Sequence, residues 1–465
     1  MERLEDMLGA VNDFMWTYIL IALLAACAIY FTVKTHFVQF RMGRELCRLL
    51  FGSDRKKKDV SRHISSFQAF IVALASRIGT GNLAGVASAI YVGGPGAVFW
   101  MWVMALFSSA SAFVESTLAQ LYKRRSKDAF VGGPAYYMKY GLGRGWMAIL
   151  FAVLTICTFG FFNSSVQSNT ICAAWEGSFG IDTTISGIVL TAATLLITFG
   201  GIHRVAKASS AIVPFMAVGY LAIAVVIIVM NIRLVPAVLR TIVESAFGIG
   251  PAAGGLVGIA VMQGVRRGLF SNEAGEGSAP HAAATATVSH PVKQGLVQAL
   301  GVFTDTLVVC SCTAFVILIS GIDYRSLNGI ELTQAALTSE IGAVGGPFIA
   351  VAILLFAFST VIANCYYGES NVLYITKNRL VLTLYRLGVG VIVMLGALMT
   401  LDLAWACVDL FMGLMTACNL AAIVPLSRHV AKLLRHYREQ RRAGKDPTFR
   451  RSDMPEIASQ LDAWD

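Results

Sequence analysis

Long apolar runs, separated by short polar segments, follow one another along almost the whole chain. Each run holds roughly the 20 residues that an α-helix needs to cross a bilayer core of about 30 Å. The pattern therefore predicts an all-α polytopic membrane protein with about eleven transmembrane helices. The expected spans are residues 15–33, 67–92, 97–121, 147–172, 184–202, 208–231, 251–265, 294–320, 346–375, 380–399 and 405–426.

The second expected span, 67–92, is interrupted at its midpoint by the polar sequence Ser76-Arg-Ile-Gly-Thr-Gly-Asn82. Two glycines weaken a helix there, and an arginine and an asparagine make the midpoint polar. A helix that faces lipid does not tolerate such a break, because hydrocarbon offers no partners for the freed backbone groups. A helix that lines a wet cavity can turn these groups toward a solute and an ion, so the break predicts a transport site.

The basic residues divide unevenly between the two sides of this arrangement. By count along the sequence, 32 of the 37 lysines and arginines fall on one predicted side, 4 fall on the other, and Arg77 lies inside a span. Basic residues favour the cytoplasmic side, so we expect the N-terminus outside and the C-terminus in the cytoplasm. The net charge of +10 is then a topology signal near anionic lipid, and it does not indicate binding to nucleic acid.

The composition also speaks against other classes of protein. Of 465 residues, 56% are apolar and only 14% are charged, and the mean hydropathy is +0.67. The N-terminus has no basic region before the first apolar run, so this run is expected to be retained and not cleaved as a signal. Cys310 and Cys312 are interpreted as packing residues, since they lie in an apolar run. No phosphate loop, zinc-protease spacing or serine-nucleophile motif is present, so we do not expect an enzyme.

After the first span, ten spans remain, and they form two halves of five, residues 67–231 and 251–426. Residues 1–66 supply an extra N-terminal helix and a basic loop. Residues 427–465 form a basic cytoplasmic tail, either a surface helix or disordered, to which we assign no function. Spans two and seven open the halves from opposite faces, and span seven is expected to break in its glycine-rich stretch 254–264. Paired breaks in two inverted halves are typical of a transporter binding site.

The segment that follows span seven, residues 267–281, is rich in glycine and small polar residues. We interpret it as an ordered cytoplasmic re-entrant segment or gate beside that span. His281 and His290 match no metal-binding spacing, and we expect them to cap or anchor helices at the interface.

Charged side chains within the spans are few. Because buried charge is costly and is normally paired, we expect Arg77 to form an ion pair with a carboxylate. The candidate partners are Glu115, Asp305, Glu369, Glu273 and Glu276.

The break in span two suggests specific contacts. The half-helix that restarts after it has unpaired N–H groups and a positive dipole end, which suit a carboxylate. The alternative is a glycine kink that serves close helix packing. The carbonyls of Ala75 and Ile78, just before the break, suit a monovalent cation. The residues expected to bind the substrate here are Gly79, Thr80, Gly81 and Asn82.

Two further polar groups lie at membrane depth. Ser359 and Thr360 in span nine offer hydroxyls to an ion, although such hydroxyls commonly bond back to their own helix. Asn163 and Gln167 in span four share one helix face, which faces either a cavity or another helix.

Five sequence blocks are similar to one known family. They are Gly79-Thr-Gly-Asn82-Leu-Ala-Gly-Val, Gly93-Gly-Pro95-Gly-Ala-Val-Phe99-Trp100-Met-Trp102, Glu115-Ser-Thr-Leu-Ala-Gln120-Leu-Tyr, Gly132-Gly-Pro-Ala-Tyr-Tyr and Gly268-Leu-Phe-Ser-Asn-Glu-Ala-Gly-Glu-Gly-Ser-Ala-Pro280. Over residues 65–425 the chain resembles the alanine/glycine:cation symporter family. The resemblance implies a bacterial or archaeal inner-membrane symporter that takes up alanine or glycine with sodium. It also implies a leucine-transporter-like 5+5 inverted repeat with one extra N-terminal helix.

The resemblance also assigns roles to residues. It implies that the first break holds the amino-acid carboxylate, that Gln167 contacts the substrate, and that Met262, Gln263 and Gly264 line the pocket. Asn82 matches one ligand of a second sodium site of this fold, and the other ligands of that site have no match. The implied sodium ligands are the carbonyls of Ala75, Ile78 and Phe356 and the hydroxyls of Ser359 and Thr360.

The resulting hypothesis is a sodium-driven symporter for small neutral amino acids that works by alternating access. Its expected partners are alanine or glycine, sodium as the coupling ion and the lipid bilayer, with no other cofactor and with a monomer as the functional unit. The nearest alternative is proton coupling in the same fold, with Asp305 or Glu115 as the carrier. A channel is a second alternative, and a membrane enzyme is a third.

Overall fold

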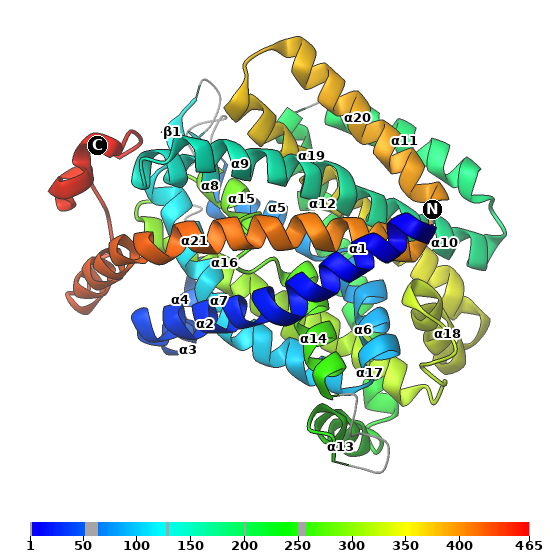
Figure 1. Cartoon of the computed structure of the whole chain (residues 1–465). Helices are drawn as coiled ribbons and strands as arrows, with labels where there is room; N and C mark the ends of the chain where they lie inside the picture. Colours follow the sequence, from blue (N-terminus) through cyan, green and yellow to red (C-terminus); the bar gives the residue numbers. More distant parts are fainter. Residues whose placement is uncertain (1, 52–63, 127–129, 200, 250–256, 465) are drawn as a thin grey trace.

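The computed structural model describes residues 2–51, 64–126, 130–199, 201–249 and 257–464 (Figure 1). The described chain is helical apart from an isolated bridge and one antiparallel hairpin of β1 (Arg124–Arg125) and β2 (Phe130–Val131). Its first part contains the helices α1 (Glu2–Phe14), η1 (Met15–Leu20), α2 (Ile21–Lys34), α3 (Val38–Arg41), α4 (Gly43–Phe51), α5 (Ser66–Arg77), η3 (Gly81–Gly85), α6 (Val86–Gly93), α7 (Gly96–Leu121), α8 (Pro134–Tyr136), η4 (Tyr137–Gly141), α9 (Gly145–Thr155), η5 (Ile156–Asn163), α10 (Ser164–Phe179), α11 (Thr183–Thr198), α12 (Gly201–Met230) and α13 (Val235–Ala246).

The second part begins with a helix that breaks and restarts, and it ends in a long helix followed by a short ordered tail. Its helices are α14 (Val257–Asn272), α15 (Ala279–Thr285), α16 (Pro291–Val302), η6 (Phe303–Cys310), α17 (Ser311–Ile319), α18 (Gly329–Ile341), η7 (Gly342–Val344), α19 (Gly345–Ile375), α20 (Arg379–Leu398), α21 (Leu401–Arg442), η8 (Arg451–Asp453) and η9 (Pro455–Gln460).

Within the described residues, eight helices are long and apolar enough to cross a membrane, and a ninth span arises if α5 and the segment Gly81–Gly93 count as one. Two of the eleven expected spans fall outside this count. The expected span 184–202 corresponds to the shorter apolar helix α11. The expected span 251–265 lies partly outside the described residues, and its described part belongs to α14. The number eleven therefore stays a prediction.

Local sequence signals set several helix ends. The Ser65 side chain and Gln68 form a reciprocal capping box at the start of α5. The Thr400 hydroxyl accepts from the Leu403 N–H at the start of α21. His290 caps α16, where its Nδ1 accepts from the Val292 N–H at 3.2 Å, which confirms the capping role expected for it.

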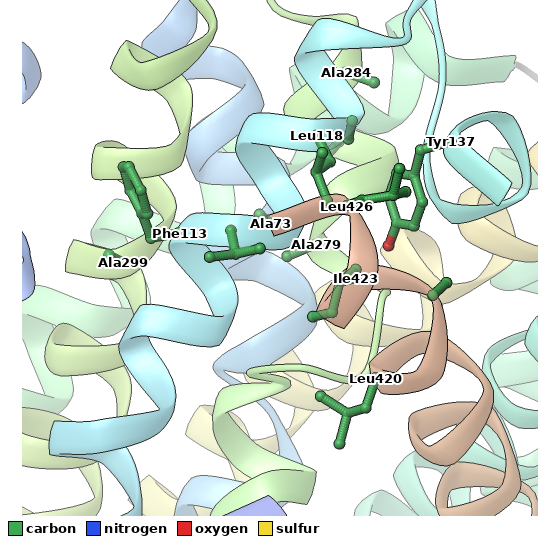
Figure 2. Packing of buried hydrophobic residues seen from close by; sticks show 14 of the residues in the cluster. Ala73, Phe113, Leu118, Tyr137, Ala279, Ala284, Ala299, Leu420, Ile423 and Leu426 are labelled. Atoms are coloured by element: carbon green, nitrogen blue, oxygen red, sulfur yellow. The ribbon is translucent and has the colours of Figure 1, made fainter. Parts of the chain in front are cut away.

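The interior is built from small side chains that bring helices close together (Figure 2). In Figure 2, Ala299 of α16 lies beside Phe113 of α7, and Ala279 and Ala284 of α15 belong to the same buried cluster. At Gly295 of α16, an added Cβ would lie 2.8 Å from the Phe113 carbonyl oxygen. Association of helices in a membrane depends on such close packing, because lipid is as apolar as the side chains.

The helix α21 runs beside α1 and α2 and continues well beyond residue 426, the expected end of the last span (Figure 1). The tail after it folds back against the protein. Trp464 is buried and donates from Nε1 to the Gln120 carbonyl at 3.1 Å, and the Phe449 N–H donates to the Ser289 carbonyl at 2.9 Å. The tail is therefore an ordered part of the structure and not a disordered one.

Candidate functional site

The first break separates α5 from α6. The helix ends at Arg77, Ile78 leaves helical geometry with φ −79° and ψ 88°, and the wide turn η3 begins at Gly81. The two helical parts are bent by 49° relative to each other. The chain is buried throughout this region, so the polar backbone groups of the break need partners within the protein.

Two side-chain amides supply partners for the freed N–H groups. The Gly79 N–H donates to Asn82 Oδ1 at 3.0 Å, and the Thr80 N–H donates to Gln167 Oε1 at 2.9 Å. Gln167 in turn donates to Asn163 Oδ1 at 2.9 Å, so this face of α10 points to the break. Its other face packs on α20, where Asn169 donates to the Met399 carbonyl. Asn163 Oδ1 also accepts from Asn364 Nδ2 of α19 at 3.0 Å, so the face shared by Asn163 and Gln167 contacts neighbouring helices, and a cavity at this face stays a prediction.

Oxygen atoms converge on the other side of the break. Thr360 Oγ1 of α19 lies 2.9 Å from the Ala75 carbonyl oxygen, 3.4 Å from that of Ile78 and 3.1 Å from that of Phe356. Ser359 Oγ donates to the same Phe356 carbonyl at 2.8 Å. The structure thus brings together all five residues that the family resemblance suggested for sodium. Because Ser359 satisfies the Phe356 carbonyl and the single Thr360 hydroxyl hydrogen satisfies only one carbonyl at a time, a carbonyl of Ala75 or Ile78 is left without this donor.

The second break lies further along the chain than the glycine pattern predicted. The helix α14 is continuous through Gly258 and Gly264 and ends at Asn272, while Gly254 and Gly255 lie outside the described residues. The backbone then turns at Glu273, Gly275 and Gly277, with φ of 55°, 92° and 94°, before α15 begins. Glycine adopts such positive φ values without the steric cost that a Cβ brings. The segment interpreted as a cytoplasmic re-entrant segment beside span seven is therefore the break itself.

The two breaks meet. A Cβ on Gly81 would lie 3.0 Å from the Ser271 Cα and 3.1 Å from the Phe270 ring, so only a glycine permits this approach. Asp305 of η6 joins the two sides, because it accepts from Asn82 Nδ2 at 2.7 Å and from Ser271 Oγ at 2.7 Å. The sequence singled out Asp305 as a buried charge, but it did not identify Ser271.

Met262, Gln263 and Gly264 do not lie at either break. They precede Asn272 by eight residues or more along a continuous helix, which corresponds to about 12 Å. Gln263 lines a separate cavity of about 170 Å³. Gly264 serves packing, since a Cβ there would lie 2.6 Å from the Ala97 carbonyl oxygen. A glycine that permits close packing and a glycine that permits a break look alike in the sequence.

Arg266 and Arg267 were counted with the cytoplasmic charges, but they lie within α14 and line the same cavity as Gln263. Arg267 forms a buried ion pair with Asp409 of α21 and stacks on Trp405 at 3.9 Å. Arg266 lies 3.4 Å from Asp13. These contacts place the two arginines inside the protein and not in a cytoplasmic loop. The predicted excess of basic residues on the cytoplasmic side does not depend on them.

Aromatic rings separate this cavity from the breaks. The ring of Trp405 lines the cavity and packs edge-on against Phe270, with centroids 4.6 Å apart. Phe270 covers Gly81 on its other side. The two rings therefore lie between the cavity and Gly81.

Arg77 does not form the expected ion pair. Within the described residues no carboxylate lies within 4 Å of it, and its Nη1 donates instead to the Gln298 carbonyl at 3.2 Å and to Gln298 Oε1 at 3.3 Å. The guanidinium passes over Gly301, where a Cβ would lie 2.1 Å from Nη1. Glu369, one of the expected partners, pairs with Arg386 at 2.8 Å.

Solved structures share this architecture. The transporter MhsT, solved in complex with L-phenylalanine, matches 87% of this chain and 94% of its own with a TM-score of 0.51 at 13% identity. A manganese transporter of Eremococcus coleocola matches 79% of this chain and 78% of its own, also with a TM-score of 0.51, at 14% identity. Together with the two broken helices, this likeness defines the fold class: an all-α, multi-pass membrane protein with the leucine-transporter-type inverted repeat.

Within that class, the chain belongs to the sodium:alanine symporter family, whose sequence profile matches residues 1–451. "Probable sodium/glutamine symporter GlnT" of Bacillus subtilis is 49% identical over 463 residues, which cover 99% of this chain and 96% of the relative. "Sodium/alanine symporter AgcS" of Methanococcus maripaludis is 38% identical over 448 residues and 94% and 98% of the two chains. "Sodium/proton-dependent alanine carrier protein" of Bacillus sp. PS3 is 40% identical over 408 residues and 84% and 91% of the two chains.

Proposed function

We propose that this protein imports small neutral amino acids, alanine or glycine, together with sodium. The observation that carries the proposal is the contact of Thr360 Oγ1 with the carbonyls of Ala75, Ile78 and Phe356. It forms a cluster of hard oxygen ligands across α5 and α19, next to a half-helix whose N–H groups suit a carboxylate. The names of two relatives, a sodium/alanine symporter and a sodium/proton-dependent alanine carrier protein, agree with alanine as the substrate and sodium as the coupling ion.

In the proposed site, the substrate carboxylate binds at the N–H groups of Gly79 and Thr80. Gln167 Oε1, which now accepts from Thr80, moves aside and contacts the bound amino acid. Sodium binds between the Ala75 and Ile78 carbonyls of α5 and the hydroxyls of α19, and so links the broken helix to the opposite half. Gln263 is assigned to the outer cavity and Gly264 to packing against α7, and neither these two residues nor Met262 is assigned to the substrate pocket.

We propose that the protein is a monomer in the bacterial or archaeal plasma membrane, with its N-terminus outside and its C-terminus in the cytoplasm. Moving one sodium ion down a potential of about 100 mV supplies about 2.3 kcal/mol. This corresponds to roughly 50-fold accumulation before any sodium concentration gradient is added, because about 1.4 kcal/mol is tenfold.

Glutamine is a second candidate substrate for the same site. The specific observation in its favour is the 49% identity to the relative named as a sodium/glutamine symporter, which extends over nearly the whole of both chains. A competition series with alanine, glycine, D-alanine, serine and glutamine ranks these substrates in one experiment.

The test is uptake of labelled alanine into proteoliposomes with an inward sodium gradient, compared with matched potassium. Accumulation above equilibrium with sodium alone is the expected result. Uptake that ignores sodium and follows an imposed pH gradient would replace sodium coupling by proton coupling. Rapid equilibration without accumulation would identify a channel.

A further inference from the structure

Glu276 is an unusual residue of the second break. It lies between Gly275 and Gly277 and is only 1% exposed. Neither of its carboxyl oxygens has a hydrogen-bond partner among the described residues. A carboxylate without donors is strongly destabilised in such a place, whereas the neutral acid is not.

The other buried carboxyls of this region all have donors. Glu115 accepts from the Gly275 N–H at 3.2 Å and from Asn419 Nδ2 at 2.8 Å. Glu273 accepts from Ser76 Oγ at 2.6 Å and from Ser278 Oγ at 2.5 Å. Such donors stabilise a charged carboxylate. Asp305 has three of them, from Asn82, Ser271 and Thr306.

The charged surroundings of Glu276 also favour its neutral form. Glu273 at the end of α14 and Glu115 of α7 act on it as negative groups, and Arg77 of α5 is the positive group in range. Arg77 does not pair with Glu276 directly, because its hydrogen bonds are with Gln298. Like charges at close range make simultaneous ionisation costly.

The remaining titratable groups that face this region do not supply a positive charge. The Tyr367 hydroxyl of α19 has no partner among the described residues and is a neutral donor. Tyr137 of η4 donates to Asn419, which also binds Glu115. The ring of His281 on α15 is engaged by the Ser278 carbonyl and by Asn371, on the two sides of its imidazole.

We propose that Glu276 is a proton-binding site of the transport cycle, occupied in the closed state and emptied when the second break opens. The inference rests on the proposed symport function and adds a proton as a second ion, at a residue other than Asp305 or Glu115. On opening, the O–H bond of the Glu276 carboxyl breaks, its electron pair stays on the carboxylate and the proton passes to water. When the second break closes, the Glu276 carboxylate takes up a proton from water and the O–H bond forms again.

The position of Glu276 indicates from which side the proton exchanges. It directly precedes α15, whose far end reaches Ala286, and Lys123 donates to the Ala286 carbonyl at 3.0 Å near the C-terminal tail. This is the side that we propose to be cytoplasmic. The helix α15 packs through small alanines such as Ala279 and Ala284, and it is also held by hydrogen bonds of His281 with Asn371 and of the Ala286 carbonyl with Lys123. In the proposed cycle, displacement of α15 opens Glu276 to the cytoplasm.

The transport test varies the pH inside proteoliposomes at a fixed sodium gradient and fixed external pH. Uptake by the unmodified protein is expected to slow several-fold as the internal pH rises from about 6 to about 8, because closure then waits for a proton. Glu276→Gln needs no proton and is expected to give a flat profile. Glu331→Gln, which changes an exposed glutamate of α18, is the matched control and keeps the unmodified profile.

Either of two results overturns the proposal: a Glu276→Gln profile like that of the unmodified protein, or no response of the unmodified protein to internal pH. A second measurement does not depend on transport. Infrared spectra of the purified protein are expected to contain a protonated-carboxyl band that Glu276→Gln lacks and Glu331→Gln retains. Where Glu276→Gln does not fold, Glu276→Asp shifts this band, and an unshifted band rejects the assignment. If uptake by the unmodified protein does not depend on sodium while the protonated-carboxyl band is present, the sodium symport function is rejected and the proton site at Glu276 is retained.

Discussion

The first break interrupts the helix for two residues, Ile78 and Gly79, because Thr80 already has helical φ and ψ values, whereas the second lies between Asn272 at the end of α14 and Ala279 at the start of α15. The first needs no positive φ value, and the second has three. The N–H groups of the first are capped by neutral amides, and the second contains two buried glutamates. Backbone N–H groups that a side-chain amide can release suit an anionic carboxylate. Buried carboxyls suit a proton.

The comparison teaches that two helices broken at matching places of a repeat need not do the same work. Next to the two breaks, Gly81 approaches Ser271, and Asp305 accepts hydrogen bonds from Asn82 on one side and from Ser271 on the other. The proposed solute site and the proposed proton site therefore flank the same contact between two helices. The following experiments test each part of this division.

The largest effect is expected from Gly81→Val. Its side chain would meet the Ser271 backbone, which cannot move aside without shifting α14, and overpacking of this kind costs about 1–3 kcal/mol. Sodium-driven uptake per folded protein should fall by about tenfold or more. Gly258→Val is the control, since no atom lies within 4 Å of a Cβ there. Equal activity of the two variants would show that the breaks can separate without loss of function.

A slightly smaller effect is expected from Thr360→Val, which keeps the shape of the side chain and removes the hydroxyl. Loss of one polar contact is worth about 0.5–1.5 kcal/mol, so the half-saturating sodium concentration should rise up to about tenfold. Thr383→Val is matched to it, because that hydroxyl bonds only to the Arg379 carbonyl of its own helix. An unchanged sodium response in Thr360→Val would show that sodium does not bind at this position.

Gln167→Ala should act on the substrate and not on the ion. We expect the KM for alanine to rise by about fivefold, since the contact is a single neutral hydrogen bond, while the sodium response stays the same. Asn169→Ala lies on the same helix but loses contacts with the Gly396 and Met399 carbonyls of α20 and of the turn after it. Its KM should remain close to that of the unmodified protein. A shift in the sodium response of Gln167→Ala alone would contradict the separation of the two sites.

The smallest effect is expected from Gln263→Ala. This side chain lines the outer cavity, beyond the rings of Phe270 and Trp405, so the KM for alanine should change by no more than about twofold. Competition between alanine and glycine should be unaltered. A change as large as that of Gln167→Ala would restore residues 262–264 to the substrate pocket.

Much of the first break could be predicted from local sequence, because glycine, threonine, arginine and asparagine in an apolar run are costly unless they serve a site. The second break could not be placed in this way. Glycine is frequent throughout residues 254–277, and the sequence does not distinguish Gly264, which permits contact with α7, from Gly275 and Gly277, which have positive φ values. The role of the hydroxyls of α19 could not be predicted from the local sequence either. Thr360 does bond to its own helix, as such residues commonly do, and it also reaches α5.

Hydropathy and charge along the chain are sufficient to predict a multi-pass helical membrane protein, the uneven charge of its two sides and the presence of a break in residues 67–92. Each of these depends on residues close together in the sequence, and the bilayer imposes the same length and polarity on every span. Contacts between distant residues are decided by tertiary packing. Among the residues that the structure describes, Arg77 meets Gln298 and not a carboxylate, Gly81 meets Ser271, and Glu276 has no donor, because helices far apart in the sequence pack side by side.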